Sequence, residues 1–258
     1  MLKVRFHLLL LIFLGSGFAA PAKDKIETFG STERSESALI GILYDLKQNQ
    51  KREPVPMEQK SFLEILARFI DDGWDEGILN KYYRVSHPLY ATELVIDKID
   101  ADLAPKAFGV EKTVKPRLWV VYYKGQVSPP QDGTYRFVGF ADNYLAVAIN
   151  AKTVLVTCLP SSVIPTKWYP KEKKTGLWGR REECLGGDWI DLKAGQIVDI
   201  DIIFGEVPGG DCSCFLGIQK KGEELPLSKH RGLRDPHPFQ LTRSSHSLPN
   251  TIPWKGVQ

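Results

Sequence analysis

A carboxylate and an amide stand side by side at Asp142 and Asn143, between the apolar runs 134–140 and 144–150. Asp and Asn hydrogen-bond to nearby backbone and tolerate left-handed conformations, so the pair is typical of a turn between two strands. Their side-chain oxygens are equally suited to polar contacts with a ligand. Both interpretations stay open: turn chemistry alone, or part of a binding site with Tyr144 as its aromatic wall.

Other residues offer little for catalysis. His87 precedes a proline, and the remaining histidines after residue 22 fall in a C-terminal segment that gives a general base no rigid support. Asp199 and Asp201 face one way on a predicted strand, as a glycosidase acid pair would, but the regular alternation around them favours solvent-facing positions. No nucleophile-elbow, metalloprotease or phosphate-loop motif occurs. The sequence therefore predicts a protein that is not an enzyme.

Four cysteines, Cys158, Cys184, Cys212 and Cys214, favour disulfides if the chain is exported, and three pairings are possible. Cys212 and Cys214 lie two apart, so on a strand both face one side, and each is expected to reach Cys158 or Cys184 rather than the other. Free thiols and a zinc site are the alternatives. Zinc is disfavoured because C-x-C without a second close pair lacks the usual ligand spacing.

The first residues predict export. Lys3 and Arg5 precede a short apolar run, and Ala20-Pro21-Ala22 supplies small residues for cleavage after Ala22, so we interpret residues 1–22 as a secretory signal peptide. A retained membrane anchor is the alternative, although the run is short for a hydrocarbon layer of about 30 Å. No later stretch is long and apolar enough to cross a bilayer. The expected location is periplasmic, secreted or cell-surface.

The charge of the chain is too small to indicate a nucleic-acid partner. The net charge is +3, and it falls to +1 without Lys3 and Arg5. The basic runs at 171–174 and 180–181 are interpreted as solvated loop charges, with a grip on an anionic polymer as the alternative.

The elements that must position these side chains are mostly strands. Apolar residues alternate with a period of two over several short segments, and turn signals such as Pro129–Gly133 and Pro208–Asp211 separate them. Such a pattern predicts an antiparallel β-sandwich. The predicted strands are 38–47 (for which a helix is the alternative), 94–96, 117–123, the two runs within 132–155, 198–202 and 214–218.

A helical hairpin interrupts the strands. Apolar residues repeat at helical spacing over Ser61–Ile70, where Ser61 and Glu64 resemble a capping box, and a second helix is expected over Trp74–Tyr83. The segments at the two ends are expected to lack regular secondary structure. Residues 23–37 are expected to be a flexible lead-in, and 221–258 a disordered or surface-draped tail.

The order of these pieces resembles the protective-antigen (PA-14) domain family. Leu39–Asp45 resembles the opening strand of that family, and Leu118–Phe137 resembles its apolar strand, Pro-rich turn and D-G-x-Y-x-F strand. Ala141–Lys152 stands where the family has a D-D-G turn and the strand after it, and 189–218 resembles the closing strands. The resemblance covers about 38–220 and implies a jelly-roll β-sandwich. The segments at about 57–84 and 156–188 look like insertions.

In sugar-binding members of that family, adjacent aspartates at this turn hold a calcium ion that the sugar hydroxyls also bind. Only Asp142 carries over unchanged, because Asn143-Tyr144 replaces the usual Asp-Gly. Asn143 still offers a carbonyl oxygen, which calcium accepts, but one negative charge is lost. The resemblance therefore implies at most a weak calcium site at Asp142 and Asn143, and no cofactor other than calcium is predicted.

Three tryptophans of the 156–188 region and its border are candidates for stacking on sugar rings: Trp168, Trp178 and Trp189. Burial in support of an inserted loop is the alternative. Trp178, between Gly176 and Gly179 in a basic loop, is the best candidate for an exposed ligand-binding ring.

The predicted function is non-catalytic binding of a glycan at the cell surface or in a periplasm. The first alternative is a protein-interaction or structural module of the cell envelope that docks a protein partner through its insertions. A polysaccharide hydrolase is the second, weakened by the lack of catalytic motifs.

Overall fold

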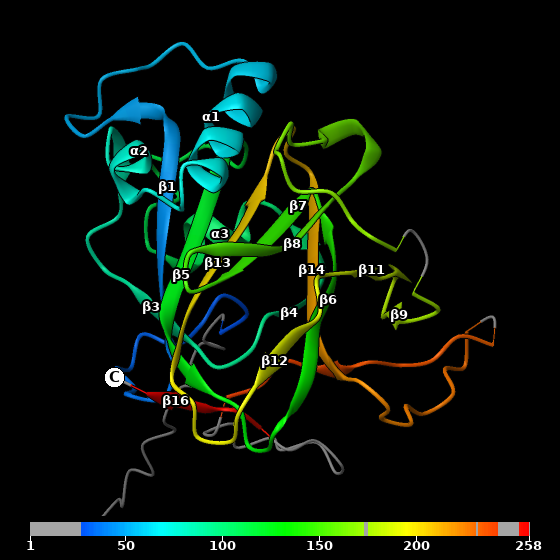
Figure 1. The fold of residues 1–258 in the computed structure, drawn as a ribbon. Coiled ribbons are helices and arrows are strands. Elements are labelled where there is room, and N and C mark those ends of the chain that lie inside the picture. Colours follow the sequence, from blue (N-terminus) through cyan, green and yellow to red (C-terminus); the bar gives the residue numbers. More distant parts are fainter. Residues whose placement is uncertain (1–26, 173–174, 231, 242–252, 258) are drawn as a thin grey trace, which may run out of the picture.

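Two antiparallel β-sheets face each other in the computed structural model, which describes residues 27–172, 175–230, 232–241 and 253–257 (Figure 1). The predicted signal peptide lies outside these residues. The chain is mainly β, as the sequence predicts. Among the described residues, no helix has the length and apolar content needed to cross a bilayer.

The first sheet runs in the order β2-β1-β5-β13-β7-β8, with β3 paired to β1 and β16 paired to β5. Its strands are β1 (Leu39–Asn49), β2 (Tyr82–Arg84), β3 (Leu89–Ala91), β5 (Trp119–Ser128), β7 (Tyr144–Ile149), β8 (Lys152–Cys158), β13 (Val198–Glu206) and β16 (Lys255–Val257).

The second sheet runs in the order β11-β6-β14-β15, with β12 paired to β6 and β4 paired to β14. Its strands are β4 (Val95–Asp100), β6 (Gly133–Asp142), β11 (Leu185–Gly186), β12 (Ile190–Leu192), β14 (Asp211–Lys220) and β15 (His237–Pro238). A separate short hairpin joins β9 (Trp178–Gly179) to β10 (Glu182–Glu183).

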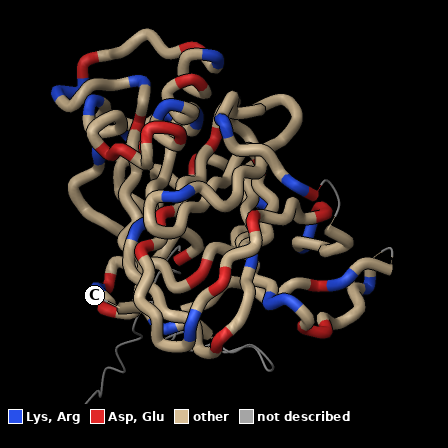
Figure 2. Tube along the Cα trace, viewed as in Figure 1, with Lys and Arg blue, Asp and Glu red and all other residues tan. Residues whose placement is uncertain are grey.

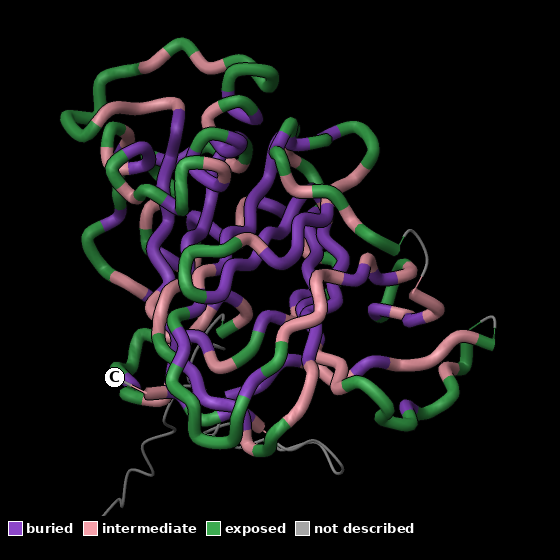
Figure 3. Tube along the Cα trace, in the orientation of Figure 1, coloured by how far each residue is buried: buried purple, intermediate pink, exposed green. Residues whose placement is uncertain are grey.

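Alternate side chains of both sheets meet in one interior layer, as the period of two predicts. Trp119, Val121 and Tyr123 of β5 belong to the same buried cluster as Phe137 of β6 and Leu216 of β14. Figure 3 shows this layer as the continuous buried interior. The predicted strands 117–123, 198–202 and 214–218 are confirmed.

Helices α1 (Gln59–Asp71) and α2 (Glu76–Leu79) cover the outer face of the first sheet. Phe62, Leu66 and Phe69 of α1 pack there against Tyr122 of β5 and Tyr144 of β7. The first predicted helix is confirmed. The capping box is wrong, because Glu58 is the N-cap and Ser61 already lies inside the helix.

The second predicted helix is shorter than expected, because 82–84 leaves it and pairs with β1 as β2. The remaining helices of the described residues are α3 (Leu103–Ala107) and a single 3₁₀ turn (Pro160–Ser162).

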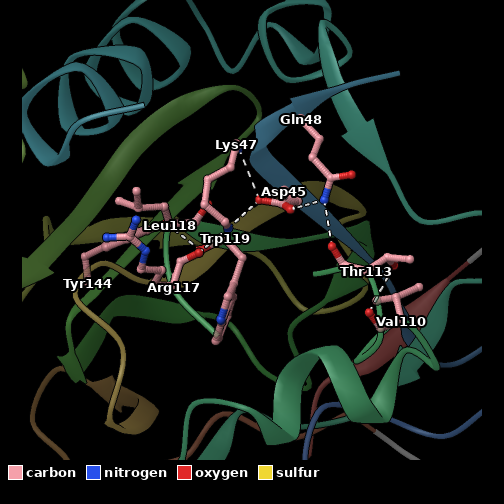
Figure 4. Close-up of polar contacts among 9 residues, drawn as sticks. All are labelled: Asp45, Lys47, Gln48, Val110, Thr113, Arg117, Leu118, Trp119 and Tyr144. Atoms are coloured by element: carbon pink, nitrogen blue, oxygen red, sulfur yellow. Dashed lines mark hydrogen bonds and ion pairs between the residues drawn. The ribbon is translucent and has the colours of Figure 1, made fainter. Parts of the chain in front are cut away.

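A buried polar network ties β1 to the segment before β5 (Figure 4). The Asp45 carboxylate, fully buried, accepts from the amine of Lys47 and, at 2.7 Å, from Nε2 of Gln48. Lys47 also donates to the carbonyl of Arg117, and Gln48 to that of Thr113 at 2.8 Å. Burial lowers the pKa of Lys47, and the Asp45 carboxylate opposes that shift. The network fixes where β5 begins beside β1.

Part of the C-terminal segment expected to be loose is buried. Phe239, Leu241 and Trp254 belong to the interior cluster, and the Trp254 ring lies 5.3 Å from Tyr135 and 6.2 Å from Phe137. Isolated aromatic residues without periodicity gave no strand or helix signal, yet each stabilises the fold through buried area. These described residues therefore depart from the predicted disordered or draped tail.

The cysteines are free thiols, so the predicted disulfides are not formed. Cys212 and Cys214 do face one side, into the interior cluster, but Cys184 lies on the outer face of the second sheet with Phe215. Cys158 ends β8 in the other sheet. Sheet backbone therefore separates Cys184 from Cys212 and Cys214. Among the described residues, no group of three or more His, Cys, Asp or Glu residues is placed to hold a metal ion.

Candidate functional site

The corner at 142–144 joins the two sheets, since β6 ends at Asp142 and β7 begins at Tyr144. Asn143 between them is 2% exposed, and the Asp142–Asn143 peptide bond is cis. The Asn143 side-chain oxygen accepts from the N–H of Val207 at 2.7 Å, and its main-chain oxygen accepts from the N–H of Leu159 at 2.8 Å. Asn143 therefore holds two loops in place rather than facing a ligand.

Tyr144 is not an aromatic wall of a site, contrary to the sequence-based prediction. Its side chain is fully buried under α1, with its ring 6.1 Å from Phe62 and its hydroxyl donating to the carbonyl of Trp119 at 3.4 Å (Figure 4). Tyr144, Ala146 and Ala148 of β7 lie on the face of the first sheet that α1 covers, whereas Leu145 and Val147 face the interior between the sheets.

The residues at this corner do not fit the calcium ion that the resemblance implies. Both oxygens of Asn143 already accept from backbone N–H groups. Asn143 Nδ2 in turn donates to Asp142 Oδ1 at 3.0 Å. One free carboxylate oxygen of Asp142 remains, whereas calcium takes six to eight oxygen ligands.

A buried carboxyl lies behind the corner. Glu206 is 0% exposed; its Oε1 accepts from the N–H of Gly209 at 2.9 Å, and its Oε2 has no partner among the described residues. Burial raises the pKa of Glu206 to about 8, with a further rise from the Asp142 carboxylate. Burial also raises the pKa of Asp142, although Arg181 lowers it. The raised pKa values of Glu206 and Asp142 weaken the negative charge that this corner offers to a cation.

A groove of about 570 Å³ lies beside the corner, and we call it the loop groove. One wall is the end of β8 and the loop 159–170, and the other is residues 182–185, which comprise the second strand of the β9–β10 hairpin and the two residues after it. Phe140, two residues before Asp142 on the same face of β6, contributes to its lining. The Leu159 N–H bond to Asn143 fixes the start of the loop. The corner thus positions the groove without lining it.

Aromatic side chains line the loop groove. Tyr169 is 76% exposed, and Trp168 beside it is half-buried, with Nε1 donating to Asp188 at 3.3 Å. Val163 is 59% exposed on the same loop. A fixed indole next to an accessible phenol ring forms an apolar surface with polar edges.

The other two candidate tryptophans lie outside the loop groove. Trp178 is half-buried and stacks on His230, with ring centroids 5.1 Å apart. Trp189 is half-buried beneath the Arg136 guanidinium, which lies 4.5 Å from its ring centroid. The structure therefore brings only Trp168 to the groove.

Sequence reasoning missed Tyr169 and the glutamates Glu182 and Glu183 of the hairpin wall. The sequence did carry a signal for Tyr169. Two aromatic residues stand next to each other between Pro165 and Pro170, in a loop that lacks the apolar periodicity needed to bury both. The glutamates carried no signal, because charged hairpin residues are ordinary.

Asp199 and Asp201 lie on the outer face of the first sheet, and Asp199 is exposed as predicted. Asp201 is half-buried and accepts from the hydroxyl of Tyr122 at 2.5 Å. Burial raises the pKa of Asp201, which the Tyr122 hydrogen bond opposes. Lys and Arg alternate with Asp and Glu along the trace in the view of Figure 2. Within the two basic runs, Lys171 pairs with Asp188 at 2.9 Å and Arg180 with Asp97 at 3.0 Å.

No family model and no curated protein matches the chain. Solved structures do resemble it. The PA14 domain of an antifreeze protein is 15% identical with a TM-score of 0.39, and the match covers 72% of this chain and 84% of that one. The A domain of epithelial adhesin 6 from Candida glabrata, solved with Galβ1-3GlcNAc, is 16% identical with a TM-score of 0.43, covering 74% and 83%.

The PA14 sugar-binding domain of an RTX adhesin is a third such structure, at 11% identity and a TM-score of 0.34, covering 73% of this chain and 93% of that chain. At these identities and TM-scores the likenesses assign the chain to no family.

Proposed function

We propose that this protein binds carbohydrate, without catalysis, in the loop groove. The observation that carries the proposal is the exposed ring of Tyr169 beside Trp168 in a groove of about 570 Å³. Sugar rings present apolar C–H faces that stack on aromatic rings, while their hydroxyls need polar partners. Ligand sites in general combine an apolar lining with a few placed polar groups.

The groove lining supplies those polar groups. Thr157 and Thr166 contribute hydroxyls, and Glu182 and Glu183 contribute carboxylates. The Thr166 hydroxyl donates to the carbonyl of Trp168 at 3.3 Å, which helps to hold the loop. Asp142, half-buried at the adjacent corner, is proposed as a further polar contact at the end of the groove.

The proposed setting is outside the cytoplasm, where glycans of a cell surface or envelope are available. The basic and apolar first residues, followed by small residues before Ala22, support export.

The test is glycan-array binding of the wild-type protein, followed by titration of the best ligand against Tyr169→Ala. Losing one stacked ring should weaken affinity by about 0.5–1.5 kcal/mol, or roughly two- to tenfold. Ile197→Ala, which removes another exposed apolar side chain (54% exposed) far from the groove lining, is the control and should bind as the wild type does. Binding that Tyr169→Ala leaves unchanged would place the ligand elsewhere.

A protein ligand is the second candidate, favoured by Val163 at 59% exposure on the same loop as Tyr169. The surface that this candidate needs is the loop 159–170 and not the helical segment 57–84, since α1 buries its apolar face on the first sheet. It predicts no array signal and a partner whose capture is lost in Val163→Ser with Tyr169→Ala.

A further inference from the structure

The charged side chains among the described residues that line the loop groove are all negative. Glu182 and Glu183 are the only residues with a carboxyl side chain among its described lining residues, and that lining holds no Lys, Arg or His. Its two thiols, Cys158 and Cys184, stay protonated because burial raises the pKa of each. A ligand in the groove therefore meets two negative charges and no positive one from the described residues.

Three neighbouring cations are engaged outside the groove. Lys171 pairs with Asp188 at 2.9 Å, and Arg181, next to Glu182, donates to the hydroxyl of Ser213 at 3.0 Å. Arg136 pairs with Glu172 at 2.6 Å and lies over Trp189. These contacts hold Lys171, Arg181 and Arg136 on partners other than the groove carboxylates.

The two glutamates differ in what they already bind. Glu183 Oε1 accepts from the N–H of Gly176 at 2.9 Å, which fixes that side chain at the base of the hairpin. Glu182 is exposed, and its side chain forms no hydrogen bond or ion pair with the described residues. One carboxylate is thus held in place, and the other is free to meet a ligand.

We propose that the loop groove prefers glycans that carry protonated amines, such as de-N-acetylated hexosamine oligomers, over neutral and acidic glycans. The proposal rests on the function proposed above and specifies the ligand class of the same groove. An acidic glycan would bring like charge against Glu182 and Glu183, whereas an ammonium group would pair with them. The aromatic surface of Trp168 and Tyr169 serves all three classes alike and so does not discriminate among them.

The test uses three probes of equal length: tetra-N-acetylchitotetraose, its fully de-N-acetylated counterpart at a pH at which its amines are protonated, and tetragalacturonate. Titration calorimetry on the full chain should give tightest binding for the amine and weakest for the uronate. Exposed ion pairs contribute little individually, so the expected preference of amine over neutral probe is about two- to tenfold. Raising the salt should shrink that preference, because salt screens exposed charges.

Glu182→Gln with Glu183→Gln should abolish the preference, because affinity for the amine probe falls to that for the neutral probe when the two negative charges are removed. Glutamine keeps the oxygen that accepts from Gly176, so the hairpin is preserved. Glu111→Gln, which removes the same charge from an exposed position outside the groove, is the matched control and should keep the preference.

The outcomes separate the two proposals. Equal affinity for amine and neutral probes, with Tyr169→Ala weakening both, overturns the charge preference and leaves sugar binding intact. Failure of every probe to bind overturns sugar binding in the groove, and the charge preference with it.

Discussion

The corner at 142–144 and the loop groove beside it use similar residue types in opposite ways. At the corner, Asn143 and Tyr144 are 2% and 0% exposed, and their polar atoms bond to the chain itself. In the groove, Tyr169 is 76% exposed and Glu182 has no partner among the described residues. The polar residues inside the apolar stretch therefore hold the turn between two strands. The side chains that a ligand can reach lie on the neighbouring loop and hairpin.

The two regions are nevertheless coupled. The main-chain oxygen of Asn143 holds the N–H of Leu159, the residue at which the groove loop leaves β8. A rigid corner therefore sets the position of a surface loop, so damage at the corner is expected to reach the groove through displacement of the backbone.

The tyrosine pair gives the largest expected contrast. Tyr144→Ala should destabilise the fold by about 3–5 kcal/mol, because it removes a fully buried ring packed on Phe62. Tyr169→Ala should change stability by no more than about 0.5 kcal/mol, as exposed positions do. Urea unfolding of both variants measures the difference. If both variants were destabilised equally, the Tyr169 ring would be packed in the fold and unavailable to a ligand.

Asn143→Ala should cost about 1–3 kcal/mol, because it leaves the buried N–H of Val207 without its acceptor. Asp142→Asn is the matched control. Its amide oxygen still accepts from Asn143, so little stability should be lost. Thermal and urea unfolding check both. A stable Asn143→Ala protein with lost glycan binding would instead make Asn143 a ligand contact.

Glu206 predicts how stability depends on pH. Its folded-state pKa of about 8 lies above the ordinary value of 4.5, so between these values the folded chain keeps a proton that the unfolded chain releases. The contribution of Glu206 to the free energy of unfolding is therefore fully present below pH 4.5 and is lost as the pH rises through 8.

Glu206→Gln should remove that dependence and stabilise the protein at pH 8 by roughly 1–2 kcal/mol, less than the full shift implies because buried surroundings relax around a charge. Urea unfolding of the two proteins at pH 5, 6.5 and 8 gives the difference between their free energies of unfolding. The contributions of the other titrating groups cancel in this difference. A gap that stays constant with pH would mean that Glu206 is ionised throughout.

The smallest effect is expected at Trp178. Trp178→Phe should leave glycan affinity within about twofold, because its ring stacks on His230 and lies outside the groove lining. Titration of the ligand found on the array checks this. A loss as large as that of Tyr169→Ala would extend the binding surface to the β9–β10 hairpin.

The sequence by itself determined the sandwich. Strands with a period of two bury one face against a second layer, and here Trp119, Phe137 and Ile202 reach a common interior between the two sheets. Helical spacing likewise fixed α1. Residues without a period carried no such signal, so the burial of Trp254 in the core was not predicted.

The site was decided by tertiary structure. Asp142, Asn143 and Tyr144 stood out because they interrupt apolar runs, but sequence does not tell which face a corner residue presents or which loop consumes its hydrogen bonds. The groove is lined by Tyr169 from the loop 159–170 and by Glu182 from the β9–β10 hairpin. Local periodicity reports burial along one element, whereas a groove depends on the distance between two elements, and only the packed sheets fix that distance.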